Sequence, residues 1–412
     1  MKGPWKLFEA LTDPRGVSER DRARALDRAR ILAARTGGFF PFFRTVEGAT
    51  SRQVKVDGEW KLVLGSNNYL GLTHHPRVLE AARDALAAYG TGATGSRLLN
   101  GTFDLHEELE ERLAGFLGKE DAVVCSAGYL TNLATLSGVL GRHDHVLLDR
   151  LNHASLLDAA LLSRASTRRY PHDDVRGLRR SLARLAGQDG RKLVVTDGVF
   201  SMDGSVADLR VVVDAAGEAG ADVMVDDAHG LGVMGPEGRG TPHDQGVQDR
   251  VALVMATFSK SLASIGGVVA GSRDDCWEIR HRARPFIFTA AAPPSALAVV
   301  GAALDVMEDE PERRERLWSS SHRLRDGLAD AGYDVGSART HVIPVFAQGV
   351  TRIGRLWKRL FRDGIFTQAV IPPAVPPDGI RLRLSVTPDH TDEDLERVVE
   401  AFRRHGKALG IV

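Results

Sequence analysis

A lysine that follows an apolar segment is the residue best placed for covalent chemistry in this sequence. The segment VALVMATF ends at Phe258, and Ser259 and Lys260 follow it before a glycine-bearing turn. Burial lowers the pKa of an amine, and a neutral amine can attack an aldehyde or accept a proton. Lysines at strand ends are more often surface residues whose charged group reaches water. Lys260 alone therefore leaves both interpretations open.

An aspartate and a histidine follow another apolar segment. The run ADVMV ends at Val225, Asp226 comes next, and His229 lies three residues later. A carboxylate there could pair with a protonated pyridine nitrogen, which keeps a cofactor ring an electron sink, and the imidazole could donate to the ring's phenolic oxygen. Each residue also has a structural alternative, as a helix cap for Asp226 and a paired loop histidine for His229. The combination with Lys260 favours pyridoxal-phosphate chemistry.

Two further segment ends carry residues that suit the same cofactor. His153, within LNHAS, has a flat ring that could stack over the cofactor. Ser126, Gly128 and Tyr129 lie between apolar AVVC and the helical stretch TNLATLSGVL, where free backbone N–H groups and the helix dipole suit a phosphate. Many histidines and many strand-to-helix turns bind nothing, so these residues gain weight only together with Lys260 and Asp226.

Composition and charge exclude several classes of protein. Lys plus Arg equals Asp plus Glu at 54 each, so a small-molecule substrate is expected, and neither nucleic acid nor an anionic membrane. Cys125 and Cys276 are the only cysteines, too few for a disulfide framework or a cysteine-based zinc site. The start MKGPWKLFEA lacks the apolar run of a signal peptide, and no stretch reaches about 18 apolar residues. We expect a cytoplasmic protein without a transmembrane segment.

The order of apolar and amphipathic stretches predicts an α/β protein. An N-terminal arm over residues 1–60, with a helix at 18–36, precedes a large domain over 61–300 and a small α+β domain over 301–412. In the large domain, short apolar runs alternate with helical stretches, which indicates a mostly parallel sheet with helices on both faces. Because each run changes to polar or glycine residues at its end, we expect the site at the carboxyl ends of the strands. The predicted strands are in DAVVCSAGY, DHVLLDRLNHAS, KLVVTDGVFS, ADVMVDDAHG, VALVMATFSK and GGVVAGS.

Two other motifs are interpreted as structural. Residues 90–95 match the glycine pattern of dinucleotide-binding loops, but they follow a helical stretch where that pattern requires a strand. His143, Asp144 and His145 lack a further ligand at a suitable spacing, so no metal site is expected.

Several longer motifs resemble those of one enzyme family. Over about residues 40–405, several segments occur in the order and at the approximate spacing found in the α-oxoamine synthases. They are GSNNYLGL, GSRLLNGTFDLHEELEERLA, LNHAS, DGVFSMDG, DDAHGLGVMGPEGRG, TFSKSLASIGG and FIFTAAAPPS. The resemblance implies the fold-type I architecture of aspartate aminotransferase and pyridoxal 5'-phosphate as cofactor. It also implies a decarboxylative condensation of a small amino acid with an acyl thioester, carried by coenzyme A or an acyl carrier protein, to give an α-aminoketone.

The resemblance also implies a role for individual residues. Lys260 would form the Schiff base, His153 would stack on the ring, Asp226 would pair with the ring nitrogen, and His229 would bond the phenolic oxygen. Ser201, Gly128 and Tyr129 would contact the cofactor, and Thr257 would contact its phosphate. Thr289 would reach the phosphate in the other subunit of a homodimer. Arg383, with Asn68 nearby, would bind the substrate carboxylate. Arg381, two residues before Arg383, competes for the carboxylate role.

Departures from the family pattern bear on the substrates. Asp197 stands where many members carry Glu, and Thr-Pro-Asp-His at 387–390 replaces the more usual Thr-Ala-Ala-His. Ala374 replaces a threonine, and Phe42 an arginine, of the 8-amino-7-oxononanoate synthases, which weakens a dicarboxylic acyl substrate. The motifs GSRLLNGT, TFSKSLASIGG and FIFTAAAPPS favour the serine palmitoyltransferase branch and a fatty or polyketide-like acyl group.

The remaining alternatives are of two kinds. Glycine, alanine and serine all remain compatible as the amino acid, and 8-amino-7-oxononanoate synthase, an aminotransferase or a lyase on the same fold remain alternatives to the expected activity. A non-enzymatic partner subunit is disfavoured because Lys260, Asp226, His229 and His153 are all present.

Overall fold

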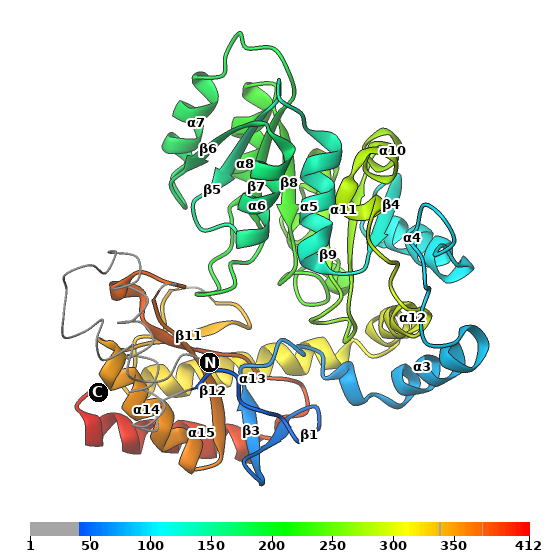
Figure 1. Ribbon diagram of the computed structural model, residues 1–412. Coiled ribbons are helices and arrows are strands. Elements are labelled where there is room, and N and C mark those ends of the chain that lie inside the picture. The colour runs from blue at the N-terminus through cyan, green and yellow to red at the C-terminus, as the bar shows by residue number, and fades with distance from the viewer. Residues whose placement is uncertain (1–40, 338, 373) are drawn as a thin grey trace, which may run out of the picture.

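The larger of two β-sheets forms the upper part of the molecule in Figure 1, which shows a computed structural model of the chain. The structure describes residues 41–337, 339–372 and 374–412, so the helix expected at 18–36 and the first 40 residues of the N-terminal arm lie outside the described residues. Within these residues the large sheet has seven strands. In spatial order they are β4 (Asp121–Cys125), β10 (Gly267–Gly271), β9 (Leu253–Thr257), β8 (Asp222–Asp226), β7 (Lys192–Asp197), β5 (His145–Asp149) and β6 (Ser166–Tyr170).

Helices cover both faces of this sheet because successive strand residues point to opposite sides. In β4, Val123 and Cys125 pack into one apolar cluster, whereas Ala122 and Val124 pack into the other. The first cluster is closed by α5 (Gly128–Val139), α6 (Ala154–Ser163), α10 (Arg273–Arg282) and α11 (Arg284–Ile287). The second is closed by α4 (Asp104–Phe116), α7 (Val175–Ala183), α8 (Leu209–Glu218) and α12 (Pro294–Asp309), with α3 (Pro76–Tyr89) packed on α12.

The smaller sheet joins segments from both parts of the sequence. It runs in the order β1 (Gly48–Ala49), β2 (Gln53–Val56), β3 (Glu59–Leu64), β12 (Ile365–Val370), β13 (Arg381–Leu384) and β11 (Ile343–Phe346). β3 lies parallel to β12, with Leu62 opposite Ile365. The helices of this part are α13 (Glu312–Asp330), α14 (Val350–Arg362) and α15 (Asp392–Leu409). Figure 1 shows them beneath the large sheet, whose strands end toward the smaller sheet.

Short elements complete the connections between strands. They are α9 (Thr241–Asp244) and the 3-10 helices η1 (Leu72–His74), η2 (Pro236–Gly238), η3 (Gln248–Arg250) and η4 (Pro377–Gly379). In the part of the chain that the structure describes, no helix combines the length and apolar character needed to cross a bilayer.

The predicted fold is confirmed, with one additional strand and one strand that belongs to the other sheet. All six predicted apolar runs form strands of the large sheet, and four of its six strand pairings are parallel in the described chain; β10 alone runs against both neighbours. β6 was not predicted, because Ser166–Tyr170 reads STRRY and carries no apolar run. β3 contains Lys61 to Leu64 but belongs to the smaller sheet, although the large domain was predicted to begin at residue 61.

Candidate active site

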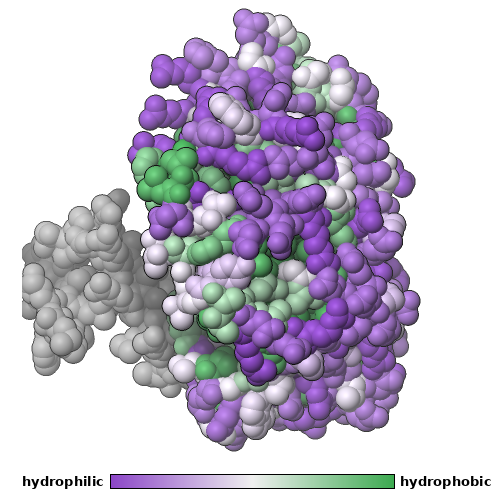
Figure 2. Space-filling model, turned by 90° about the vertical axis from the view of Figure 1, so that its right-hand side faces the viewer, coloured by the Kyte–Doolittle hydropathy of each residue, from purple (hydrophilic) through white to green (hydrophobic). Residues whose placement is uncertain are grey.

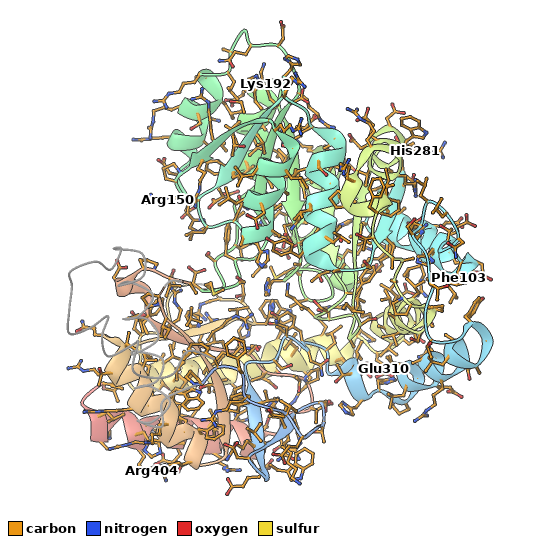
Figure 3. All side chains as sticks on the ribbon, in the orientation of Figure 1. Phe103, Arg150, Lys192, His281, Glu310 and Arg404 are labelled. Atoms are coloured by element: carbon orange, nitrogen blue, oxygen red, sulfur yellow. The ribbon has the colours of Figure 1, made fainter. Side chains whose placement is uncertain are left out.

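A cavity of about 170 Å³ lies at the carboxyl ends of the central strands of the large sheet. Figure 3 shows side chains filling this region between the two sheets, with Lys192, which begins β7, at the opposite edge. The cavity is lined by Gly128, Tyr129, Asn132, His153, Ser155, Asp197, Ser201, Asp226, Ala228, His229, Met255, Thr257, Ser259 and Lys260. Eight residues of the predicted site are among them, so residues spread over 133 positions of the chain converge on one space.

Lys260 lies in the turn that follows β9 and is half-buried. Burial lowers the pKa of its amine to about 8, and the charge of Arg383 acts in the same direction, whereas Asp226 and Asp197 oppose the shift. Near neutral pH the amine is still mostly protonated, but its neutral fraction is far larger than that of an ordinary lysine, and the neutral form is the one that attacks a carbonyl or accepts a proton.

Asp226 ends β8 and is held by hydrogen bonds from both sides. Asn132 donates its Nδ2 to Asp226 Oδ2 at 2.7 Å, and the backbone N–H of Ala228 donates to Oδ1 at 3.1 Å. Asn132 Nδ2 also lies 2.8 Å from the hydroxyl of Ser155. The carboxylate is thus buried, fixed in orientation and available to a cationic group in the cavity.

The neighbouring Asp227 does not line the cavity and accepts hydrogen bonds from Thr241. Thr241 donates its hydroxyl to Asp227 Oδ1 at 2.6 Å and its N–H to Oδ2 at 2.7 Å. Burial raises the pKa of Asp227 to about 7. Of the two adjacent aspartates, Asp226 is therefore the one that can serve a ligand in the cavity.

A chain of hydrogen bonds sets the tautomer of His229. Arg383 Nη2 donates to the hydroxyl oxygen of Tyr69 at 3.0 Å, and that hydroxyl lies 2.6 Å from His229 Nδ1. Burial holds the pKa of His229 well below its usual range, and the charges of Lys260 and Arg383 add to this effect. Arg383 can only donate, so the Tyr69 hydroxyl proton has two possible acceptors, His229 Nδ1 at 2.6 Å and Asn67 Oδ1 at 3.1 Å. Donation to the nearer Nδ1 leaves the proton of the neutral imidazole on Nε2. His229 can then donate to a ligand oxygen.

His153 caps α6 and presents an exposed imidazole at the cavity. Its Nδ1 lies 2.7 Å from the hydroxyl of Ser155, which fixes the ring orientation. Asp197 accepts hydrogen bonds from Asn152 Nδ2 at 2.8 Å and from the His153 N–H at 3.3 Å. Burial and the nearby Asp226 raise the pKa of Asp197 well above its usual range. The shorter carboxylate at position 197 thus still reaches the segment that carries His153.

One end of the cavity has the form of a phosphate site. α5 begins at Gly128, and no side chain among the described residues caps its N-terminus, so the N–H groups of its first turn remain available. The hydroxyls of Thr257 and Ser259 lie 3.0 Å apart beside it. A Cβ on Gly128 would approach Thr257 Oγ1 to 2.5 Å, so only glycine allows this close packing.

These groups fit pyridoxal phosphate. The helix terminus and the two hydroxyls suit its phosphate, the amine of Lys260 suits its aldehyde, and Asp226 suits its protonated ring nitrogen. A neutral His229 suits the phenolic oxygen. The buried Asn132 Oδ1, which lies at the cavity, has no hydrogen-bond partner among the described residues and so remains available to a ligand.

Arg383 and Arg381 have different surroundings although both lie on β13. Arg383 Nε donates to the carbonyl of Ser201, which lines the cavity, at 2.5 Å, and its Nη2 donates to Tyr69, whose hydroxyl contacts His229. Arg381 Nη1 donates to the Met202 carbonyl at 3.3 Å, and Arg381 lies over the ring of Phe346. The geometry favours Arg383 for the carboxylate role.

Besides Arg383, three predicted site residues do not line this cavity. Ser126 lies just before α5, Asn68 donates its Nδ2 to Thr73 at 2.9 Å, and Thr289 follows α11. Sequence reasoning missed Tyr69, Asn132 and Ser155 as parts of the site. Asn132 could have been recognised as a polar residue one helical turn after Gly128, and Tyr69 belongs to the GSNNYLGL motif.

Known proteins with similar sequences and structures share this architecture. Residues 59–402 match the family described as aminotransferase class I and II. The serine palmitoyltransferase of Bacteriovorax stolpii is 44% identical over 389 residues, covering 94% of this chain and 92% of that protein. The 8-amino-7-oxononanoate synthase of Geotalea daltonii is 42% identical over 383 residues, covering 92% of this chain and 98% of that protein. A solved serine palmitoyltransferase with pyridoxal phosphate as its internal aldimine has a TM-score of 0.91 and 35% identity, over 93% of this chain and 98% of that structure.

The matches extend over nearly the whole chain and include a structure that contains the cofactor. The chain therefore belongs to the aminotransferase class I and II family and, within it, to the α-oxoamine synthases, pyridoxal-phosphate enzymes that condense an amino acid with an acyl thioester.

Proposed function

We propose that this enzyme condenses serine, ahead of alanine and glycine, with a long-chain acyl thioester. The observation that carries the reaction class is the convergence of Lys260, Asp226, His229 and His153 on one cavity. The preference for serine and a long acyl chain is supported by the similarity to serine palmitoyltransferases in sequence and in structure. Phe42 and Ala374 add support, because they stand where resemblance places an arginine and a threonine in 8-amino-7-oxononanoate synthases.

Each polar group of the cavity has a proposed task. Bound pyridoxal phosphate supplies the aldehyde and the protonated ring that accepts the electrons released at the amino acid α-carbon. Lys260 holds the cofactor covalently and, once displaced by the amino acid, removes the α-proton with its neutral amine. Asp226 keeps the ring nitrogen protonated, because its buried carboxylate is fixed by Asn132 and Ala228.

Other residues orient the reacting groups. His153 covers one face of the ring, and His229 donates from Nε2 to the phenolic oxygen. Arg383 binds the amino acid carboxylate, with its planar guanidinium held by Ser201 and Tyr69. Gly128, Tyr129, Thr257 and Ser126 form the phosphate end, and Asn68 lies near the carboxylate. Holding both substrates in one closed space lowers the entropic barrier to a bimolecular condensation.

A substrate panel tests this function. Purified protein with pyridoxal phosphate is titrated with glycine, alanine and serine while its absorbance is recorded, and acyl thioesters of several lengths are then added while thiol release is followed. We expect serine to give the largest spectral change and long acyl chains to give the fastest thiol release. Faster turnover of a dicarboxylic acyl thioester with alanine would instead establish the 8-amino-7-oxononanoate synthase activity, for which 42% identity to such an enzyme is the supporting observation. Turnover with a keto acid and no thioester would show an aminotransferase.

The carboxylate role of Arg383 predicts a specific kinetic change. Replacing Arg383 by lysine keeps the charge but removes the planar two-pronged contact, so the KM for the amino acid should rise about tenfold or more, with a smaller change in kcat. The same substitution at Arg381 should have a smaller effect on this KM. Steady-state kinetics with the acyl thioester saturating measures both values, and a larger effect at Arg381 would assign the carboxylate to that residue.

We also propose a homodimer in which Thr289 of each chain reaches the phosphate of the other site. The exposed fractions of Leu98, Leu99 and Phe288 are 53%, 81% and 75%, and a β-bridge between Ser96 and Ala290 brings their segments together. Figure 2, which looks onto the side of α4, α10 and α12, shows apolar residues gathered across the middle of this side. Sedimentation equilibrium should show a species of two chains. The proposed location is the cytoplasm, in agreement with the buried free thiols of Cys125 and Cys276.

A further inference from the structure

The loop from Val199 to Val206 lies between the two sheets. A β-bridge between Val199 and Val206 closes it. Inside it, the Phe200 N–H donates to the Ser205 carbonyl at 2.8 Å, and the Gly204 N–H donates to the Phe200 carbonyl at 3.0 Å. These bonds make the loop a compact unit, so a displacement at one end is passed to the other.

The smaller sheet and the segment before it hold three carbonyl groups of this loop. Arg383 donates to Ser201 at 2.5 Å, and Arg381 donates to Met202 at 3.3 Å. The Thr340 hydroxyl donates to the Gly204 carbonyl at 3.0 Å. The position of Ser201 therefore helps to set the orientation of the Arg383 guanidinium.

The large sheet holds the same loop through a histidine. His172 Nε2 lies 3.3 Å from the hydroxyl of Ser205, and its Nδ1 lies 3.1 Å from Asp149 Oδ2 at the end of β5. The Ser205 hydroxyl also lies 2.7 Å from Asp203 Oδ1. The His172 ring packs edge-on against Phe200, with 4.3 Å between ring centroids. His172 thus connects a strand of the large sheet to both arms of the loop.

His172 lies outside the proposed active site. It lines a different cavity, of about 160 Å³, together with Asp149, Tyr170 and Phe200. None of these residues lines the cavity that contains Lys260. Any effect of His172 on the reaction must therefore pass through the loop.

We propose that protonated His172 is a positioning residue for Arg383, because it fixes the loop whose Ser201 carbonyl holds the Arg383 guanidinium. The proposal rests on the assignment of the amino acid carboxylate to Arg383. Its consequence is that amino acid binding responds to the charge of a histidine that touches neither substrate nor cofactor.

The protonation state decides which hydrogen bonds the loop can keep. A protonated imidazole donates from Nδ1 to Asp149 and from Nε2 to Ser205, which leaves the Ser205 hydroxyl proton for Asp203. In a neutral imidazole with its proton on Nδ1, Nε2 can only accept, so it competes with Asp203 for the one hydroxyl proton. Loss of the proton therefore removes one of the bonds that fix the loop.

The surroundings favour the protonated form. Burial by itself lowers the pKa of His172, but the hydrogen bond to Asp149 and the charges of Asp149, Asp203 and Asp173 outweigh it and raise the pKa above its usual range. The other titratable groups that line the same cavity are Tyr170, Asp174 and Asp208, and Arg381 lies 3.7 Å from Asp203 on the loop side. The positioning effect should be complete at a pH below the raised pKa of His172 and should disappear as the pH rises through it.

The test compares His172→Gln with wild type over a range of pH. Glutamine keeps a polar side chain of similar reach but carries no charge. At low pH the variant should show a KM for the amino acid about fivefold higher, as expected for the loss of one hydrogen bond, with kcat changed by less than about twofold. The ratio of the two KM values should fall toward one as the pH rises, and titration of Lys260 or of the substrate amine cancels in this ratio.

Two further variants make the outcome decisive. His145→Gln changes a histidine at the opposite end of β5, where Nε2 bonds the Asp189 carbonyl at 3.1 Å, and should leave KM unchanged at every pH. Ser205→Ala removes the link to the loop and should raise KM at low pH as His172→Gln does. A KM ratio near one at all pH values, or one that does not vary with pH, would refute the proposal. If Arg383→Lys leaves the amino acid KM unchanged, the carboxylate assignment fails instead, and the two failures are thereby distinguished.

Discussion

Lys260→Ala is expected to abolish turnover while the protein still binds pyridoxal phosphate. The amine has two proposed tasks, covalent attachment of the cofactor and removal of the α-proton, and alanine performs neither. A positioned general base alone contributes about 10² to 10⁴ in rate, so we expect kcat to fall by at least about 10⁴ when both tasks are lost. Cofactor should remain bound noncovalently, because α5 and the hydroxyls of Thr257 and Ser259 are separate from the amine.

Borohydride reduction followed by mass spectrometry measures the attachment, and thiol release measures turnover. Wild-type protein should gain the mass of one reduced cofactor per chain, and Lys260→Ala should gain none while equilibrium dialysis still detects bound cofactor. Lys192→Ala, at the opposite end of the large sheet (Figure 3), is the matched control and should retain covalent cofactor and activity. Turnover of Lys260→Ala within tenfold of wild type would remove Lys260 from the mechanism.

Asp226→Asn should slow the reaction without preventing covalent attachment of the cofactor. Asparagine keeps only one acceptor oxygen, so in this geometry it can accept from Ala228 or from Asn132 but not from both, and it carries no charge to hold a proton on the ring nitrogen. Loss of one such electrostatic contact costs about 10² to 10³ in kcat. Lys260 is unchanged, and loss of the Asp226 charge removes a factor that opposes the lowering of its pKa, so attachment should persist.

The matched control for this change lies on the same strand. Asp222→Asn alters the exposed residue that begins β8, whose ion pair with Arg191 is 2.9 Å long, and activity should stay within about twofold of wild type. Stopped-flow absorbance of the amino acid reaction and steady-state thiol release provide the readouts. Unchanged kcat in Asp226→Asn would contradict the ion pair, whereas loss of attachment would assign Asp226 to cofactor binding in place of catalysis.

The positions of Lys260, Asp226 and His153 could be predicted because each follows an apolar run that forms a parallel strand. The carboxyl ends of such strands meet at one edge of the sheet, so residues distant in the sequence come together without knowledge of tertiary contacts. β6 could not be predicted in this way. It is an edge strand with exposed positions on both faces, and its residues STRRY show neither alternation nor an apolar run.

The parts of the site that depend on packing between the sheets were beyond sequence reasoning. Tyr69 acts by lying between Arg383 and His229, which are 154 residues apart in the chain. The choice between Arg381 and Arg383 also required the structure, because two residues on the same strand face are equivalent in a periodic pattern. The role expected for Thr289 in a second subunit stays a prediction.

The pairing of β3 with β12 has a consequence for synthesis of the chain. Leu62 leaves the ribosome about 300 residues before its partner Ile365, a delay of about 15 to 60 s at typical rates of bacterial or eukaryotic elongation. All seven strands of the large sheet precede β11 in the chain, so that sheet can form while β3, paired with β2, still lacks β12 on its other side. The strand that bears Arg383 emerges later still. A nascent chain should therefore acquire the phosphate and lysine end of the site before it acquires the arginine.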